Sequence, residues 1–396
     1  MSNESAAQTL LRARNGHAHS RVTFVELFFD LVFVFAVTQL SHSLVEHLTL
    51  EGLAQTTLLM MAVWWVWIDT SWCTNWLDPE KAPVRLLLFA LMLGGLVLSS
   101  AIPKAFDTRG LTFAFALASI QVGRCLFMLW ALKGPSPGNY RNFQRITVWL
   151  ALAAVVWIVG GFAEGGTRLA LWTVALLIET MAPTVGFWVP GLGGSTTEDW
   201  DVEGGHMAER CGLFVIIALG ESILVTGAKF ASLIWTSTTV AAFVVAFVGS
   251  VAMWWIYFNV GAERASRNIA ASSDPGRIAR LSYTYLHLPL VAGIIVAAVG
   301  DELVLSHPTG NTDAKTAAVL LAGPALYLVG NLLFKRASAN SPALSHMIGL
   351  GLLALVAPAA TVLNPVTFSA ATTLVLVLVA VWETWSLRTV PAPLVD

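Results

Sequence analysis

The chain alternates between long apolar segments and short connections that are polar or rich in glycine and proline. A helix needs about 20 mostly apolar residues to cross a bilayer core, because no water is present there to satisfy an unpaired backbone group. Unbroken apolar runs such as 31–37 and 213–219 also exclude a membrane β-barrel, whose strands alternate between apolar and polar positions. The pattern therefore predicts an all-α polytopic membrane protein with about twelve transmembrane helices. The segments are 22–44, 53–72, 84–103, 111–132, 145–164, 168–188, 206–228, 234–260, 277–301, 315–336, 343–363 and 366–388.

The composition fits a protein that lies mostly in lipid. Of 396 residues, 56% are hydrophobic and only 12% are charged, whereas soluble domains carry about 25% charged residues. Such a chain cannot cover its apolar residues with a polar surface, which excludes a soluble enzyme and a disordered chain. The net charge of −2 gives no basic surplus for nucleic-acid binding, and the three cysteines form no disulfide framework. We therefore expect the lipid bilayer, and not nucleic acid, to be a partner.

The distribution of Lys and Arg predicts the orientation. With a cytoplasmic N-terminus, sixteen of these residues lie in inner segments, five lie in outer loops and Arg124 lies inside a span, which accounts for all 22. Because basic residues concentrate on the cytoplasmic side, both termini are expected to be cytoplasmic. The first apolar segment has no cleavage site after it and is expected to stay in the mature protein. Segments 145–164 and 168–188 are so close that a count of ten or eleven spans stays open.

The two halves of the chain resemble each other at four places in the same order. The sequence Trp-Trp-Val-Trp-Ile-Asp at 64–69 corresponds to Trp-Trp-Ile-Tyr-Phe-Asn at 254–259. The other three pairs are Glu26 with Glu209, Arg85 with Arg280 and Glu179 with Glu383. An even number of spans in each half makes the repeats parallel. The predicted parts are a cytoplasmic tail at 1–21, a six-helix repeat at 22–189, a cytoplasmic linker at 190–204, a second six-helix repeat at 205–388 and a cytoplasmic tail at 389–396.

Several polar side chains fall inside the predicted spans. An ionised Asp, Lys or Arg at the bilayer centre costs about 2.5–3.5 kcal/mol on insertion scales, so each needs a partner or a function. Glu26 and Asp30 are four residues apart and share one helix face. The candidate residues of an ion or substrate pathway are Glu26, Asp30, Asp69, Arg124, Glu179, Glu209, Arg210, Glu221, Asn259 and Glu383.

These residues allow two interpretations. They can bind a cation or proton along a pathway, or they can neutralise one another inside a helix bundle, with Glu209 beside Arg210 or Arg124 and Asp30 beside Arg124. Both interpretations stay open for Glu209, Arg210 and Arg124. For Asp30 and Glu221, which lie deeper and have no cation next to them in the sequence, we favour the pathway.

Motifs of catalysis are missing from the sequence. It contains no H-E-x-x-H metal motif, no nucleophile elbow and no phosphate-binding loop, so we expect no catalytic residue, no metal site and no cofactor. A lipid-modifying enzyme would have to use His206 with Glu209, or His42 with Glu46.

Two long motifs resemble the bacterial low-temperature-requirement A membrane proteins. The first is Val-Thr-Phe-Val-Glu-Leu-Phe-Phe-Asp-Leu-Val-Phe-Val-Phe-Ala at 22–36. The second combines Gly-His-Met-Ala-Glu-Arg-Cys-Gly-Leu-Phe at 205–214 with Leu-Gly-Glu-Ser-Ile at 219–223. The resemblance covers nearly the whole chain and implies a multi-pass protein of the bacterial inner membrane. The family is named for a cold-growth phenotype, and the resemblance does not indicate which species, if any, is transported.

A second resemblance covers one helix. Phe-Phe-Asp-Leu-Val-Phe at 28–33 is similar to the first-helix Phe-Ser-Asp signature of potassium channels built from six-helix repeats. This chain departs from that signature at Phe29, which replaces the serine, and at Gly212 and Leu213, where a second aspartate would be expected. The ion selectivity of those channels is therefore not transferred.

The leading hypothesis is an integral membrane transport protein. It would move a cation, proton or small solute, in a proton-linked manner, through a site between the two six-helix repeats. The first alternative is a dimeric cation channel, a homodimer with its pore lined by segments 22–44 and 206–228. Further alternatives are a membrane-embedded lipid-modifying enzyme and a structural or cold-adaptation protein.

Overall fold

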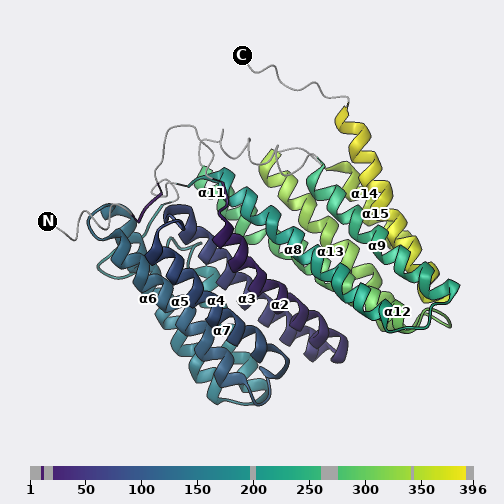
Figure 1. The fold of residues 1–396 in the computed structure, drawn as a ribbon, viewed down its shortest axis with the longest axis horizontal. Coiled ribbons are helices and arrows are strands. Elements are labelled where there is room, and N and C mark those ends of the chain that lie inside the picture. The colour runs from purple at the N-terminus through teal and green to yellow at the C-terminus, as the bar shows by residue number, and fades with distance from the viewer. Residues whose placement is uncertain (1–9, 13–20, 197–201, 260–274, 340–342, 389–396) are drawn as a thin grey trace. The chain divides into compact units, whose positions relative to one another are not determined.

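Helices and their connections account for residues 10–12, 21–196, 202–259, 275–339 and 343–388, the parts of the chain that this computed structural model describes (Figure 1). No strand occurs in these ranges, which confirms the expected all-α fold. Most of the predicted N-terminal tail, residues 197–201 of the predicted linker and the predicted C-terminal tail lie outside the described residues.

The chain divides into two packing units. Unit 1 contains Met1–Arg210 and Ser273–Arg277, and unit 2 contains Cys211–Ser272 and Ile278–Asp396. The division falls inside one helix, α8 (Gly204–Ala231). It follows packing and not sequence similarity, so the predicted duplication stays a prediction.

Unit 1 is a helix bundle in which α3 is the most enclosed member. Its helices are α2 (Phe24–Glu46), α3 (Leu50–Trp76), α4 (Ala82–Ala101), the short η1 (Ile102–Lys104), α5 (Gly110–Leu132), α6 (Pro137–Phe162) and α7 (Gly165–Met181). Helix α3 packs against α2, α5 and α7. Every α3 residue from Ala62 to Trp76 is buried except Asp69.

Unit 2 contains the rest of α8 and the following helices. They are α9 (Ser237–Phe258), the last two residues of the short α11 (Pro275–Ala279), the π-helical turn η3 (Arg280–Tyr285), α12 (His287–Ser306), α13 (Ala314–Ala339), α14 (Leu344–Val356), η4 (Ala357–Thr361) and α15 (Pro365–Arg388). Glycines bring the backbones of α12 and α13 together. A Cβ on Gly330 would lie 2.6 Å from the backbone nitrogen of Leu290, and one on Gly323 would lie 2.8 Å from that of Ala297. Small residues at such positions are typical of membrane helix pairs.

Ten helices in the described residues are long and apolar enough to cross a membrane. The two other long helices are α3 and α7, and each differs for its own reason. Helix α7 has only 17 residues, fewer than the roughly 20 that a span needs. Helix α3 has 27 residues but buries most of its tryptophan, serine and threonine side chains inside the protein, where high hydropathy is not required. Ten of the twelve predicted spans thus meet the requirements, and α3 and α7 stay predicted spans.

The outward faces of the helices suit lipid. On α6 the exposed side chains include Val148, Leu152, Val155 and Val159, which recur at three- or four-residue spacing and form one stripe. An apolar stripe of this kind is unfavourable in water and typical of a surface that contacts lipid or protein. The fold is therefore that of a multi-pass helical membrane protein.

Candidate functional site

Glu26 lies in a fully buried polar site at the N-terminal end of α2. It follows the N-cap residue Thr23 by three positions, and the Thr23 backbone N–H donates a hydrogen bond of 2.9 Å to Glu26 Oε2. Arg12 Nη2 donates to the same oxygen at 2.9 Å, and His206 Nε2 lies 2.9 Å from the other oxygen, Oε1. The carboxylate is therefore completely surrounded by donors despite its burial.

Arg12 links this carboxylate to the C-terminal end of α3. Its Nε donates to the carbonyl oxygens of Thr74 at 2.7 Å and Leu77 at 3.0 Å, and its backbone N–H donates to Trp76 O at 2.8 Å. A cation is favoured at a helix C-terminus, where carbonyl groups lack partners within the helix. Arg12 therefore caps α3 and neutralises Glu26 at the same time.

The neighbours of His206 define its protonation. The amide oxygen of Asn75 accepts from the backbone N–H of Glu203 at 3.0 Å, which turns Nδ2 of Asn75 toward His206 Nδ1 at 3.3 Å. Because that amide nitrogen donates, His206 Nδ1 accepts. A neutral ring then carries its proton on Nε2, which faces Glu26 Oε1 at 2.9 Å and also lies 3.2 Å from Arg12 Nη2. The geometry thus favours a neutral imidazole.

Asp30 forms a buried ion pair one helical turn from Glu26. Arg210 Nη1 donates to Asp30 Oδ2 at 2.9 Å, and Trp67 Nε1 donates to Oδ1 at 2.8 Å. The same guanidinium donates to Ser71 Oγ and lies over the Trp67 ring, 5.5 Å from its centroid. We call Arg12, Glu26, Asp30, His206 and Arg210 the Glu26 cluster.

The Glu26 cluster shows which of the predicted charged residues pair with one another. The expected neutralisation of Asp30 by Arg124 is wrong, because Arg210 is its partner and Arg124 pairs with Asp69. With a neutral His206, two carboxylates face two guanidinium groups, so the charges balance. Glu209 accepts a hydrogen bond of 3.1 Å from the backbone N–H of Val22.

A second buried group in unit 1 brings three predicted residues together from α3, α5 and α7. Gln121 Nε2 lies 3.4 Å from Asp69 Oδ2 and 3.4 Å from Glu179 Oε2, so one amide bridges two carboxylates. Arg124 Nη2 donates to Asp69 Oδ2 at 3.1 Å and to Gln121 Oε1. Trp157 Nε1 from α6 donates to Glu179 Oε1 at 3.0 Å. We call these five residues the Asp69–Glu179 cluster.

The Asp69–Glu179 cluster differs from the Glu26 cluster in charge. It contains two carboxyl groups and one guanidinium, and its remaining donors, Gln121 and Trp157, are neutral. The side chain of Arg124 is 1% exposed while that of Asp69 is 26% exposed, and Glu179 is 2% exposed as a residue. Within the described residues Arg124 Nε has no hydrogen-bond partner. One negative charge is therefore left without a cation when both carboxyl groups are ionised.

The predicted residues of unit 2 form a third group and two separate positions. Lys335 Nζ contacts both carboxylate oxygens of Glu383 at 2.6 and 2.7 Å, and His346 Nδ1 lies 3.3 Å from Glu383 Oε1. Asn259 Nδ2 donates to Thr384 Oγ1 at 2.9 Å. Glu221 is buried on α8, with 3% of its surface exposed.

Sequence reasoning missed several residues of these sites. Gln121 lies three positions before Arg124 on α5, so helical spacing could have indicated it. Arg12 and Lys335 were counted as charges of cytoplasmic segments, and no local pattern distinguishes them from their basic neighbours. Trp67 and Trp157 were not among the predicted site residues, although each donates to a carboxylate.

The described residues contain no group of three His, Cys, Asp or Glu side chains that could hold a metal ion. Cys73, Cys125 and Cys211 are buried free thiols. The side chains of the three sites form ion pairs and hydrogen bonds, and their carboxyl groups can exchange protons.

Comparison with known proteins identifies the family. The family model described as "Bacterial low temperature requirement A protein (LtrA)" matches residues 21–381. A protein of Rhizobium meliloti (strain 1021) described as uncharacterized is 43% identical over 369 residues, covering 93% of this chain and 90% of the relative. No solved structure matches the chain. The chain therefore belongs to the bacterial low temperature requirement A family, as the motifs at 22–36 and 205–223 predicted.

Proposed function

We propose that the protein is a proton-linked membrane transport protein in which the Asp69–Glu179 cluster binds and releases the proton. The observation that carries the proposal is the bridging of two carboxyl groups by one amide, Gln121, beside a single guanidinium. Ionisable residues inside membrane segments are costly and commonly mark ion or proton pathways. A proton or a monovalent cation would balance the extra negative charge.

The difference in exposure between the two carboxyl groups suggests the order of events. Asp69 is partly exposed and can exchange a proton with its surroundings, whereas Glu179 is enclosed. Gln121 contacts both groups, so a change in protonation at one alters the hydrogen bonding of the other. The substrate that moves with the proton would be a small cation or solute.

The Glu26 cluster has a different role in this proposal. Its two carboxylates are matched by two guanidinium groups and enclosed by hydrogen bonds, so it holds the ends of α2, α3 and α8 together in unit 1. The pathway roles predicted for Glu26, Asp30, Glu209, Arg210, Glu221, Asn259 and Glu383 stay predictions.

The proposal is tested by difference infrared spectroscopy and by proton flux. The protein in nanodiscs is titrated while the C=O stretching band of protonated carboxylic acids is recorded. Purified protein in liposomes is then given a pH gradient, and proton entry is followed with a trapped fluorescent dye. We expect Glu179→Gln to remove a carboxylic acid band and to reduce proton flux at least tenfold. The Asp69→Asn variant retains Glu179, and the C=O stretching frequency of the Glu179 carboxylic acid should shift in this variant.

Glu164→Gln is the matched control, because Glu164 is an exposed acid that immediately precedes α7 and lies outside the cluster. It should keep both the band and the flux. Equal band intensity and equal flux in the wild type and Glu179→Gln at matched protein amounts would refute the proposal. Potassium flux without proton movement in the same liposomes would favour the channel alternative.

A further inference from the structure

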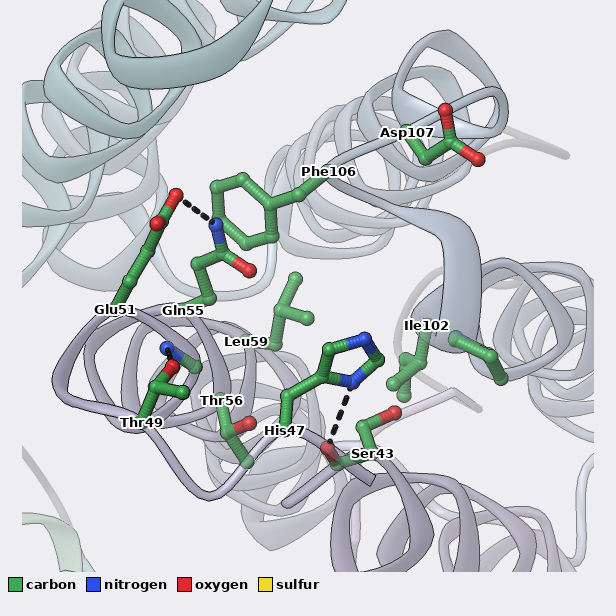
Figure 2. A pocket seen from close by; sticks show the side chains of 12 residues that line it. Ser43, His47, Thr49, Glu51, Gln55, Thr56, Leu59, Ile102, Phe106 and Asp107 are labelled. Carbon is green, nitrogen blue, oxygen red and sulfur yellow. Dashed lines mark hydrogen bonds between the residues drawn. The ribbon is translucent and has the colours of Figure 1, made fainter. Parts of the chain in front are cut away.

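A cavity of about 320 Å³ lies in unit 1 at the end of α2 opposite the Glu26 cluster (Figure 2). Ser43, in its wall, follows Glu26 by 17 positions, which corresponds to roughly 26 Å along the helix and approaches the thickness of a bilayer core. The cavity is lined by the end of α2, the beginning of α3 and the segment from Ile102 to Asp107. Its volume is at the lower end of the range of small-molecule sites.

Local backbone contacts build one wall of this cavity. The His47 N–H donates to Ser43 O at 3.1 Å and the Thr49 N–H donates to His47 O at 2.8 Å, which closes the turn between α2 and α3. Thr49 Oγ1 then caps α3 by accepting from the Gly52 N–H at 3.0 Å. A Cβ at Gly52 would collide with the carbonyl oxygen of His47, so the turn requires glycine there.

Arg168 fixes the opposite wall. Its Nη1 donates to the carbonyl oxygens of Ala105 and Asp107, each at 2.8 Å, and its side chain is buried. Phe106, between these two residues, lies 5.1 Å from the Trp172 ring in an edge-to-face arrangement. Both walls are therefore held by hydrogen bonds and ring packing within the protein, as expected of a preformed site.

The side chains that line the cavity include two carboxylates, hydroxyl groups, an amide, an imidazole and apolar groups. Glu51 lies on one side, where Gln55 Nε2 donates to its Oε1 at 3.1 Å, and Phe106 covers the middle (Figure 2). His47 Nδ1 lies 3.3 Å from Ser43 O and donates to this carbonyl oxygen. Asp107 is at the rim with its carboxylate turned outward in this view. Among the described residues, no Lys or Arg lines the cavity.

Ser43 supplies an independent observation. Its hydroxyl oxygen is buried and has no hydrogen-bond partner within the described residues. A buried hydroxyl without a partner loses free energy that a ligand can restore. The cavity wall therefore contains a polar group that remains to be satisfied.

We propose that this cavity binds a small organic ammonium compound. The ammonium group would donate to the Glu51 carboxylate, and the apolar body would lie against Phe106, Leu59 and Ile102. An aromatic ring attracts a cation over its face, and the charge of Asp107 adds a longer-range attraction. An anion would meet two carboxylates and no cation. This site is independent of the proton-exchange function proposed for the Asp69–Glu179 cluster.

Benzylamine is a suitable probe, with benzyl alcohol as its neutral and benzoate as its anionic counterpart. Binding to the protein in nanodiscs is measured by saturation-transfer NMR, and empty nanodiscs correct for partition into lipid. We expect benzylamine to bind at least tenfold more tightly than benzyl alcohol, and benzoate not to bind. Glu51→Gln should weaken benzylamine binding at least tenfold and Asp107→Asn two- to threefold, since the Asp107 carboxylate does not contact the ligand.

Glu46→Gln is the control, because Glu46 is an exposed acid near the same end of α2 that does not line the cavity. It should leave binding unchanged, and so should Glu179→Gln if the two proposals are independent. Ser43→Ala should weaken binding without lowering thermal stability, which distinguishes a ligand contact from a folding defect. Equal binding of benzylamine and benzyl alcohol, or full benzylamine binding by a folded Glu51→Gln variant, would overturn the proposal.

Discussion

Arg210 Nη1 donates a hydrogen bond of 2.9 Å to Asp30 Oδ2, and both side chains are completely buried. Removing one member of a buried pair leaves an uncompensated charge, which typically costs 3–5 kcal/mol. We therefore predict that Arg210→Met lowers the stability of the protein by about that amount. Thermal unfolding in detergent, followed by size-exclusion chromatography of heated samples, measures the change.

The double variant Asp30→Asn with Arg210→Met separates charge from packing. It should recover part of the stability that Arg210→Met loses, because no unpaired charge is left in the site. A double variant no more stable than Arg210→Met would show that the guanidinium acts through Ser71 and the Trp67 ring and not through Asp30.

The predicted orientation gives a second test at the two ends of unit 1. Glu80 lies between α3 and α4, and Glu46 ends α2; both are exposed. In a background without the three buried cysteines, Glu80→Cys should react with an impermeant thiol reagent only after cells are opened. Glu46→Cys should react from outside, because the excess of basic residues places the N-terminus in the cytoplasm.

Reaction of both cysteines from the same side would contradict the predicted crossing of α3, the helix between the two positions. Reversed labelling would contradict the orientation alone. The result also decides whether α3 spans the membrane.

Glycine packing between α12 and α13 gives a third prediction. A Cβ on Gly330 would lie 2.6 Å from the backbone nitrogen of Leu290, so Gly330→Ala must push the two helices apart. Overpacking of this kind costs about 1–3 kcal/mol. Gly351→Ala on α14 is the control, because a Cβ there meets no heavy atom within 4 Å, and it should be neutral or stabilising. Similar apparent Tm values for the two variants would exclude close backbone contact as the reason why position 330 requires glycine.

The sequence predicts the helices and the polar positions better than the partners. Periodicity places Glu26 and Asp30 on one face because the rule is local, and both lie in the Glu26 cluster. Their partner Arg210 is 180 residues beyond Asp30, and no local rule reaches that far. Asp69, Arg124 and Glu179 were named as candidates, but their meeting at Gln121 depends on the packing of α3 with α5 and α7.

Helix α3 shows a second limit of prediction from the sequence. Composition predicts membrane helices by assuming that lipid surrounds them, and that assumption fails for a helix enclosed by protein. Helix α3 buries Trp64 and Trp67 together with Ser71 and Asn75 among its neighbours. The burial of these tryptophan and polar side chains is therefore a consequence of the place of α3 in the bundle, and it became clear only from the packing.

Asp313, immediately before α13 and outside the membrane segments, gives a pH-dependent prediction. The hydroxyl of Thr316 donates to Asp313 Oδ2 at 2.6 Å, and the backbone N–H groups of Lys315 and Thr316 donate to Oδ1. These bonds, the Thr316 hydroxyl first, lower the pKa of Asp313 below its usual value of 3.8. A group with a lowered pKa in the folded state contributes stability above its unfolded pKa and loses it as pH falls through the folded pKa.

Asp313→Asn should therefore lower the apparent Tm at neutral pH and have little effect below about pH 3. The cost at neutral pH should be about 1 kcal/mol or less, because the Asp313 side chain is exposed. Thr316→Val should reduce the same pH dependence, and a difference between wild type and Asp313→Asn that stays constant from pH 7 to the acid limit would contradict the assignment.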